Sequence, residues 1–276
     1  MKGVIASLSF IIGLFSAQFV SAQTIEVLCT ASEPCGKTGG VTADGTIFAA
    51  DANPTSPSTG TGVFQPFVRI QDSTGTQSGY NTDTSNPDIQ YDTKAGIWTH
   101  SITLGDLGVT TINGVNYFQF QLDANESGAA DSIDNQIDLT DVQIYLGGEE
   151  LKTPELYGGY TGTAYDSSDN SLAGVLPVWT LDSEINGDVT TILQASVCDA
   201  SGQCGSGHGD MNMFIMADLF AGYSPDSQLV FYTEYDRVSS GFEEWRYLAK
   251  VPEVGTLGLL GLALLLLALS RRVFHK

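Results

Sequence analysis

Apolar and polar residues alternate over short stretches through much of the chain, which is the pattern of half-buried β-strands. The clearest run covers residues 115–123, where Phe118, Phe120 and Leu122 fall on one face. Asn113-Gly114 comes directly before this run and predicts a tight hairpin turn. Other strand-like patterns cover residues 23–28, 63–71, 96–104, 139–146, 175–181, 189–193, 211–220, 228–236 and 242–249.

Turn-rich stretches separate these predicted strands. Residues 39–62 and 72–87 are rich in Gly, Ser, Thr and Asp, and we expect long loops there, with at most one edge strand in the first. No apolar stripe at helical spacing and of useful length lies between the two ends of the chain. Many short strands joined by turns predict an all-β fold, a β-sandwich or jelly roll, for residues 23–250.

The N-terminal end has the layout of a secretory signal peptide. Lys2 supplies a minimal positive region, and residues 4–20 are mostly apolar. Val20-Ser21-Ala22 forms a small-residue cleavage site before Gln23. The sequence therefore predicts a signal peptide over residues 1–22 and export of the rest, with an uncleaved N-terminal anchor as the alternative.

The C-terminal end predicts a single hydrophobic helix. Residues 254–269 carry no charge and consist mainly of Leu, Gly and Ala. A helix of about 16 residues is ~24 Å long, slightly short for a bilayer core of ~30 Å, so we expect it to cover about residues 254–270. Basic residues follow at once, which places the C-terminus on the cytoplasmic side. A buried soluble helix is the weaker alternative, because this run lacks a polar face.

The last part of the chain, residues 251–276, resembles the PEP-CTERM sorting signal of Gram-negative bacteria. The tripartite layout is a short motif with Pro and Glu, then a hydrophobic helix, then a basic cluster. The motif residues are Val251, Pro252, Glu253, Arg271 and Arg272. The family pattern has a second Pro after the Glu, where this chain has Val254. The resemblance implies recognition by an exosortase, a membrane transpeptidase, and a place at the cell surface or in an exopolysaccharide-associated matrix.

A second resemblance involves about 45 residues before the tail. Residues 205–211, 229–232 and 241–245 are similar to an arrangement found in uncharacterised exported proteins with PEP-CTERM tails. It implies kinship and no particular activity. We expect Phe242 and Trp245 to pack on the core, and Glu243 and Glu244 to point into solvent.

The charge balance excludes one class of partner. The chain has 11 Lys and Arg residues against 32 Asp and Glu residues, a formal net charge of −21. A surface this acidic repels nucleic acid and anionic lipid, and it attracts divalent cations. We therefore expect no nucleic-acid partner.

The four cysteines fall into two local pairs, Cys29 with Cys35 and Cys198 with Cys204. In an oxidising compartment two local disulfides are the simplest interpretation, and each is expected to contribute ~2 kcal/mol, since the loops are short. Four cysteines allow three pairings. A zinc site is the less favoured alternative, because the spacing is not C-x-x-C.

One acidic loop has the spacing of a calcium site. Oxygen-bearing side chains stand at positions 1, 3, 5, 9 and 12 of the stretch that starts at residue 123, and Gly128 stands at position 6. The candidate ligands are Asp123, Asn125, Ser127, Asp131 and Asp134. A solvated acidic hairpin loop is the alternative interpretation. Residues 182–188 make a poorer match, for which an Asn-Gly turn is the alternative.

No sequence motif predicts catalysis. The chain has no P-loop, dinucleotide fingerprint or nucleophile elbow, and we interpret His100, His208 and His275 as structural. We therefore predict a non-enzymatic exported protein. The alternatives are a secreted carbohydrate-binding module, which would need exposed coplanar aromatic side chains, and a secreted polysaccharide hydrolase, which would need two carboxylates about 5–10 Å apart in a cleft. The candidate aromatics are Trp98, Tyr157, Tyr160 and Trp179.

Overall fold

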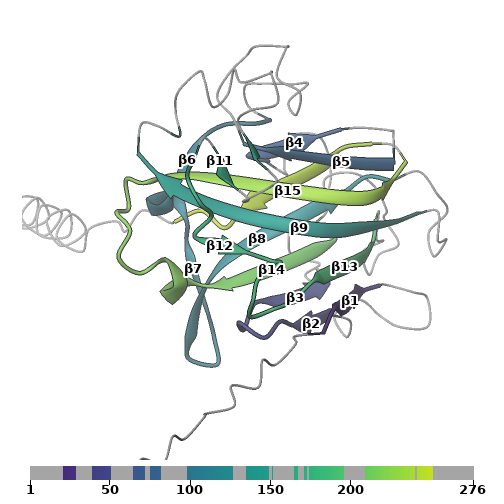
Figure 1. The fold of residues 1–276 in the computed structure, drawn as a ribbon, viewed down its shortest axis with the longest axis horizontal. Coiled ribbons are helices and arrows are strands. Elements are labelled where there is room, and N and C mark those ends of the chain that lie inside the picture. The colour runs from purple at the N-terminus through teal and green to yellow at the C-terminus, as the bar shows by residue number, and fades with distance from the viewer. Residues whose placement is uncertain are drawn as a thin grey trace, which may run out of the picture.

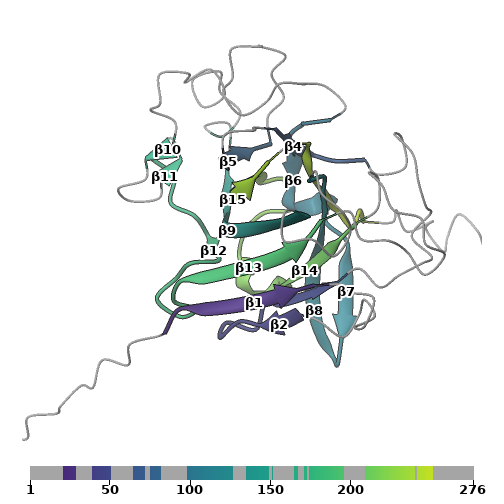
Figure 2. The ribbon, with the colours of Figure 1, turned by 90° about the vertical axis from the view of Figure 1, so that its right-hand side faces the viewer.

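The computed structural model shows an all-β fold made of two stacked β-sheets, as the sequence predicts (Figures 1 and 2). No helix in the described part of the chain is long and apolar enough to cross a membrane. The structure describes residues 21–28, 39–50, 65–71, 75–81, 98–126, 135–148, 151, 165–166, 171–172, 174–195, 209–239 and 241–250.

The first sheet has seven strands and is antiparallel except at one edge, where its first strand runs parallel to β13. Its long central strands are β9 and β15, which pair along almost their whole length. In spatial order the main strands are β1 (Gln23–Val27), β13 (Val189–Gln194), β9 (Gln136–Gly147), β15 (Gln228–Val238) and β5 (Gly75–Tyr80). Two short strands complete it: β12 (Trp179–Thr180) pairs with β9, and β6 (Ile102–Thr103) pairs with β15.

The second sheet also has seven strands and is antiparallel throughout. In spatial order six of them are β2 (Gly39–Val41), β3 (Ile47–Ala50), β14 (Met211–Met216), β8 (Val115–Ala124), β16 (Glu243–Tyr247) and β4 (Val68–Ile70). The seventh, β7 (Val109–Ile112), pairs with the start of β8.

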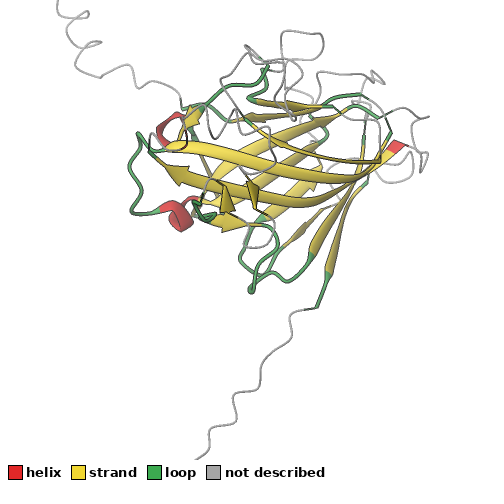
Figure 3. Cartoon of the chain, turned by 45° about the horizontal axis from the view of Figure 1, so that its top comes forward, coloured by secondary structure: helices red, strands yellow, loops and turns green. Residues whose placement is uncertain are grey.

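Short elements in the described part of the chain also lie outside these ladders. Two 3-10 helices, η1 (Leu104–Asp106) and η4 (Ala217–Phe220), lie at the same end of the sandwich (Figure 3). A small hairpin, β10 (Tyr165–Asp166) with β11 (Ser171–Leu172), lies on the outer side of the first sheet (Figure 2).

The hairpin between β7 and β8 confirms the turn that Asn113-Gly114 predicts. Both residues have positive φ, 51° at Asn113 and 85° at Gly114. A two-residue turn with this backbone matches the right-handed twist of the two strands that it joins. The outer residues of this hairpin are solvent-exposed, and Phe120, Leu122 and Ala124 further along β8 are fully buried.

Some strand predictions were wrong in position or extent. We expected a loop at residues 72–87, but β5 lies within it, because pairing with β15 supplies a stability that this Gly- and Ser-rich segment does not show locally. Residues 39–50, the described part of the stretch 39–62, hold two strands instead of one, β2 and β3. The runs 96–104 and 175–181 each keep only a two-residue strand in their described part, and the run 211–220 ends in η4.

The core between the sheets is built around Phe231 of β15. Its ring centroid lies 5.0 Å from that of Phe120, 5.0 Å from that of Trp245 and 5.5 Å from that of Phe67. All four side chains are fully buried. Aromatic pairs at these separations stabilise a core beyond the area that they bury.

The end of β8 approaches the start of β16 very closely at Gly241. This residue has φ +91°, and a Cβ built on it would lie 1.5 Å from the Asn125 carbonyl oxygen. We expect Gly241→Ala to lower the free energy of unfolding by more than ~3 kcal/mol, because it combines backbone strain with a clash against main chain. Thermal denaturation measures this as a loss of several degrees.

Gly222→Ala is the matched control. Gly222 also has positive φ, +100°, but no atom lies within 4 Å of the position that its Cβ would take. Gly222→Ala is expected to lower the free energy of unfolding by only ~1 kcal/mol, because the left-handed backbone is its sole source of strain. Equal losses of thermal stability in the two variants would contradict the close approach at Gly241.

Candidate functional site

Most of the sequence-predicted site residues lie outside the described residues. This holds for the sorting residues 251–253 and 271–272, for all four cysteines and for the calcium candidates Ser127, Asp131 and Asp134. Those assignments stay predictions.

Two calcium candidates lie at the described end of β8. Asp123 is 1% exposed, and the Asn125 side-chain amide donates to the Asp123 carboxylate at 3.4 Å and to the Phe242 carbonyl at 3.0 Å. Within the described segments, no group of three or more His, Cys, Asp or Glu side chains is arranged to hold a metal ion. A calcium site here would therefore depend on ligands from the following loop, and it stays a prediction.

The second, poorer calcium match forms a turn. Gly187 and Ser183 exchange backbone hydrogen bonds, and Gly187 has φ +74°. The Asn186 side chain is buried; its Oδ1 accepts from the Asp44 backbone N–H at 2.9 Å and its amide donates to the Leu181 carbonyl at 3.1 Å. The Asn-Gly turn is thus present, and Asn186 joins the two sheets instead of facing a cation.

Asp44, after β2, links the sheets at this point. Its carboxylate accepts hydrogen bonds from Thr42 Oγ1 at 2.5 Å and from Trp179 Nε1 at 2.7 Å. Burial alone would raise the pKa of Asp44, but these hydrogen bonds and one from the Thr46 backbone lower it overall. Trp179 is consequently a structural residue, 6% exposed, and not part of an exposed aromatic platform.

Trp98 and His100 lie beside β4. The Arg69 guanidinium lies over the Trp98 ring at 4.8 Å and over the Phe242 ring at 3.5 Å, and the His100 backbone N–H donates to the Phe67 carbonyl. These contacts explain the local packing. Tyr157, Tyr160 and His208 lie outside the described residues.

The expectation that Glu243 and Glu244 point into solvent was wrong. Glu243 is 0% exposed and Glu244 is 8% exposed. Glu243 lies between the sheets, where the Gln77 side-chain amide of β5 donates to its Oε2. Glu244 lies on the outer face of the second sheet and forms an ion pair with Arg69 at 3.0 Å. The sequence shows two adjacent acids, and only the tertiary structure reveals that both are buried, Glu243 between the sheets and Glu244 beside Arg69.

Burial raises the pKa of Glu243 well above its usual value, and the carboxylates of Glu126 and Asp123 raise it further, against the lowering effect of the hydrogen bond from Gln77. A buried carboxyl that holds its proton is a neutral hydrogen-bonding group in the core. Beside it, the Trp245 indole N–H donates to the Tyr235 hydroxyl at 2.5 Å.

The outer face of the first sheet carries the best candidate for chemistry. Asp141 of β9 and Glu234 of β15 stand directly opposite each other in the strand register. Both are half-buried, so they retain some access to solvent. Directly opposed side chains on neighbouring strands have Cβ atoms roughly 4.5–5.5 Å apart. The sequence alone did not reveal this carboxylate pair, because its two residues come from strands far apart along the chain.

A hydrogen-bonded network surrounds this pair. The Gln143 amide donates to the Asp141 carboxylate at 2.5 Å, and the Tyr145 hydroxyl donates to Gln143 Oε1. On the next strand the Tyr232 hydroxyl donates to the Glu234 carboxylate at 2.9 Å. We call these five residues the carboxylate face. Its tyrosines belong to a second apolar cluster that Leu172 of β11 helps to cover.

The two carboxylates of this face are electrostatically coupled. Burial raises the pKa of Asp141 to about 6, and the charges of Asp182 and Glu234 add to the shift, while the hydrogen bond from Gln143 opposes it. A carboxyl group with this pKa exchanges its proton near neutral pH, which suits a general acid or base. Buried structural carboxylates share this property, so the pKa of Asp141 by itself assigns no reaction.

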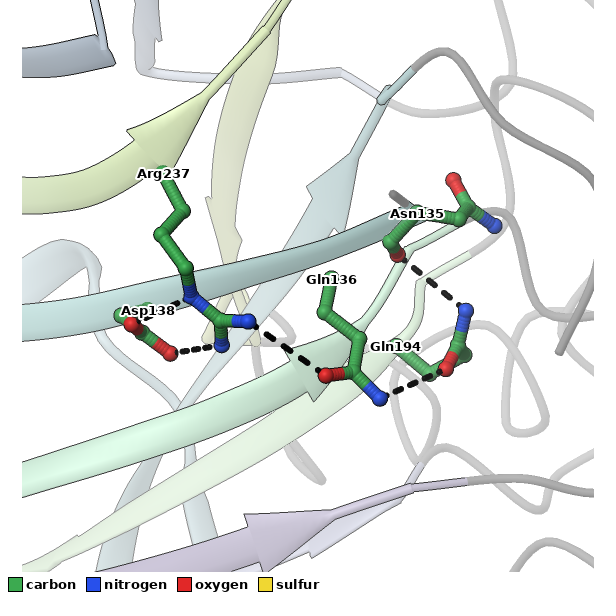
Figure 4. A network of polar contacts seen from close by, with 5 residues as sticks. All are labelled: Asn135, Gln136, Asp138, Gln194 and Arg237. Atoms are coloured by element: carbon green, nitrogen blue, oxygen red, sulfur yellow. Dashed lines mark hydrogen bonds and ion pairs between the residues drawn. The ribbon is translucent and has the colours of Figure 1, made fainter. Parts of the chain in front are cut away.

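A second polar ladder crosses the same outer face further along the strands (Figure 4). The Arg237 guanidinium binds both oxygens of Asp138, and Arg237 Nη1 also donates to Gln136 at 3.4 Å. Gln136 donates to Gln194 at 3.4 Å, and Gln194 donates to the Asn135 carbonyl at 3.2 Å. Asp138 raises the pKa of Arg237 through this hydrogen bond. The ladder connects β15, β9 and β13, and both carboxylate oxygens of Asp138 bind Arg237.

The buried carboxyl of Glu243 makes the stability depend on pH in an unusual direction. Since its pKa is raised in the folded state, the folded protein holds the proton more tightly than the unfolded chain does. Its contribution is complete below its ordinary pKa of about 4.5 and is lost as the pH rises toward the raised value. We expect Glu243→Gln, which cannot ionise, to be more stable than wild type at pH 8, by a difference that is larger at pH 8 than at pH 4.

Chemical denaturation of both proteins between pH 4 and pH 9 measures this difference. Glu26→Gln is the control, since it makes the same chemical change at an exposed position of β1, outside the core. A Glu243→Gln profile parallel to that of wild type would show that Glu243 does not titrate differently in the two states.

Comparison of this chain with protein-family models, with curated proteins and with solved structures finds no match. Its function is therefore inferred from its own residues and their arrangement.

Proposed function

We propose that this chain is an exported, non-enzymatic β-sandwich protein that its C-terminal segment sorts to the cell surface or extracellular matrix. The observation that supports this proposal is the order of three parts along the chain: an apolar N-terminal segment, the β-sandwich and an apolar C-terminal run with a basic end. An apolar N-terminal segment with a small-residue cleavage site precedes Gln23, and an apolar run with a basic end follows residue 253. The described strands of the two sheets lie between Gln23 and Tyr247, so these two segments flank the folded part along the sequence.

Each part of the tail has its own role in this proposal. The apolar run at 254–270 holds the exported protein in the inner membrane, and Arg271 and Arg272 keep its end on the cytoplasmic side. An exosortase-type transpeptidase then recognises Val251-Pro252-Glu253 and releases the folded domain. Lys250, directly before this motif, is exposed, which agrees with access for a membrane enzyme.

The acidic surface fits an environment outside the cell. Residues 23–250 hold 7 Lys and Arg against 31 Asp and Glu, a net charge of −24, which keeps the released domain soluble and apart from anionic polymers that lack bridging cations. Association with an exopolysaccharide would therefore use neutral sugars or divalent cations, and Ca²⁺ at the loop after β8 is the candidate cation. The two cysteine pairs are expected to be oxidised there.

Tail variants test the sorting proposal. We expect Pro252→Ala with Glu253→Ala to leave the protein in the inner-membrane fraction with an uncleaved tail, because the recognition motif is lost. We expect Arg271→Glu with Arg272→Glu to disturb retention itself, since the basic end fixes the orientation. Fractionation with intact-mass measurement in a host that carries an exosortase separates these outcomes.

Lys250→Ala is the control, since it changes a neighbouring charge outside the motif. A wild-type chain that keeps the mass of its whole tail and stays in the membrane fraction, as the motif variant is expected to do, would contradict tail processing. Recovery of the wild-type protein from the cytosol with its residues 1–22 still attached would contradict export altogether.

A second candidate function rests on the carboxylate face. Asp141 and Glu234 form an opposed pair on neighbouring strands. A retaining glycosidase uses two carboxyl groups about 5–5.5 Å apart. Asp141, with a pKa of about 6, would donate the proton, and Glu234 would act as the nucleophile. This candidate makes the protein a polysaccharide hydrolase and uses no exposed aromatic platform.

Release of reducing ends from a panel of soluble polysaccharides tests this second candidate. If the pair is catalytic, Glu234→Gln is expected to lower the rate by at least ~100-fold. Asp236→Asn is the control, because Asp236 is exposed on the same strand and should leave the rate unchanged. An absence of release by the folded wild-type protein, or equal rates in both variants, removes the hydrolase and leaves the non-enzymatic proposal in place.

A further inference from the structure

The chain stays bound to the sandwich up to the last described residue. The Leu248 backbone N–H donates to the Gln119 carbonyl at 2.9 Å, and the Gly108 N–H donates to the Leu248 carbonyl at 2.7 Å. The Lys250 backbone N–H donates to the Asp106 carbonyl at 2.8 Å. Lys250 is therefore a fixed point on one end of the fold, next to η1.

Very little chain separates this fixed point from the apolar tail. Three residues, Val251, Pro252 and Glu253, lie between Lys250 and the uncharged run that starts at Val254. A fully extended chain gains at most ~3.6 Å per residue, so the start of the apolar run lies within ~15 Å of Lys250. With the tail in a bilayer, this end of the sandwich must lie close to the headgroup region, which extends several ångströms beyond the hydrocarbon core.

This end is assembled from three chain segments. The Gly105 N–H donates to the Pro225 carbonyl at 2.7 Å, which joins η1 to the loop after η4. The rings of Phe118 and Phe220 pack with centroids 5.5 Å apart, which joins η4 to β8. Figure 3 shows η1 and η4 together at this end of the molecule. We call the surface of residues 104–109, 217–226 and 248–250 the tail-proximal end.

Exposed apolar side chains gather in the same three segments. Four large hydrophobic residues of the tail-proximal end are substantially exposed: Val109 (52%), Leu219 (39%), Tyr223 (44%) and Leu248 (41%). Tyr and Leu at a surface of this kind suit the boundary between headgroups and acyl chains, where an aromatic ring with a polar tip is favoured.

The charges of this end limit which lipids it can approach. Asp106, Asp218 and Asp226 are exposed here together with the cation of Lys250. An excess of negative side chains is repelled by anionic headgroups and tolerated by zwitterionic ones. Apolar contact, and not charge attraction, is thus the interaction that this surface offers.

We propose that the tail-proximal end docks onto the surface of the membrane while the tail is inserted, with Leu219 and Tyr223 at headgroup level. This proposal rests on the proposed sorting function, because it needs the tail in a bilayer. Docking holds the sandwich end-on against the membrane and keeps residues 251–253 at the interface, where a membrane transpeptidase works.

Tryptophan depth in lipid tests the docking. The full chain, with its tail, is reconstituted into phosphatidylcholine vesicles with and without brominated acyl chains, once as Leu219→Trp and once as Ile185→Trp. Ile185 is 62% exposed in the turn before β13 and serves as the matched control on the same background of native tryptophans. We expect the fluorescence added at position 219 to be quenched roughly twofold more than that added at position 185.

Three outcomes contradict the docking proposal, and they are distinguishable. If the chain floats with the vesicles but both variants are quenched equally, the sandwich does not dock, and the sorting proposal survives. If the chain does not float with the vesicles, the tail does not insert, and both proposals fail. Quenching at position 219 that grows when anionic lipid is added would also contradict the apolar contact, since the exposed aspartates predict a decrease.

Discussion

The fold depends on the aromatic contact between its two sheets. Phe231 of the first sheet meets Phe120 and Trp245 of the second sheet with ring centroids 5.0 Å away in both cases. Side chains alternate between the two faces of a strand. When these three aromatic side chains point into the core, the residues directly before and after each of them point outward. The inward positions of β15 and β8 therefore determine where the polar residues of both outer faces stand, including the carboxylate face.

One carboxyl group interrupts this apolar layer. Glu243 stands on β16 two residues before Trp245, so it shares the inward face, and Gln77 from the opposite sheet donates a hydrogen bond to its Oε2. The raised pKa of Glu243 lets the group stay neutral, which lowers the cost of burying it. A hydrogen bond between sheets also fixes how the sheets register on each other, since an apolar contact alone tolerates sliding.

The outer surfaces offer two different kinds of contact. The carboxylate face combines half-buried acids with hydrogen-bonded tyrosine and glutamine side chains. It therefore offers polar contacts from side chains that the sheet holds in place. The tail-proximal end combines exposed apolar side chains with scattered acids at the place where the chain leaves the fold. The sandwich thus holds these two surfaces in a fixed geometry relative to the point where the tail begins.

The sequence by itself determined the fold class, the clean strands and the hairpin turn, because period-two alternation and Asn-Gly are local signals that survive in the folded state. The proposal of export and sorting also rests on the sequence alone, because it depends only on the apolar length and flanking charge of the two ends. Tertiary structure alone decided that Gly- and Ser-rich β5 is a strand, since its partner β15 lies about 150 residues away. It likewise decided that Glu243 is buried and that Asp141 faces Glu234, because stacking and register bring together residues whose local sequence indicates only a solvated acid.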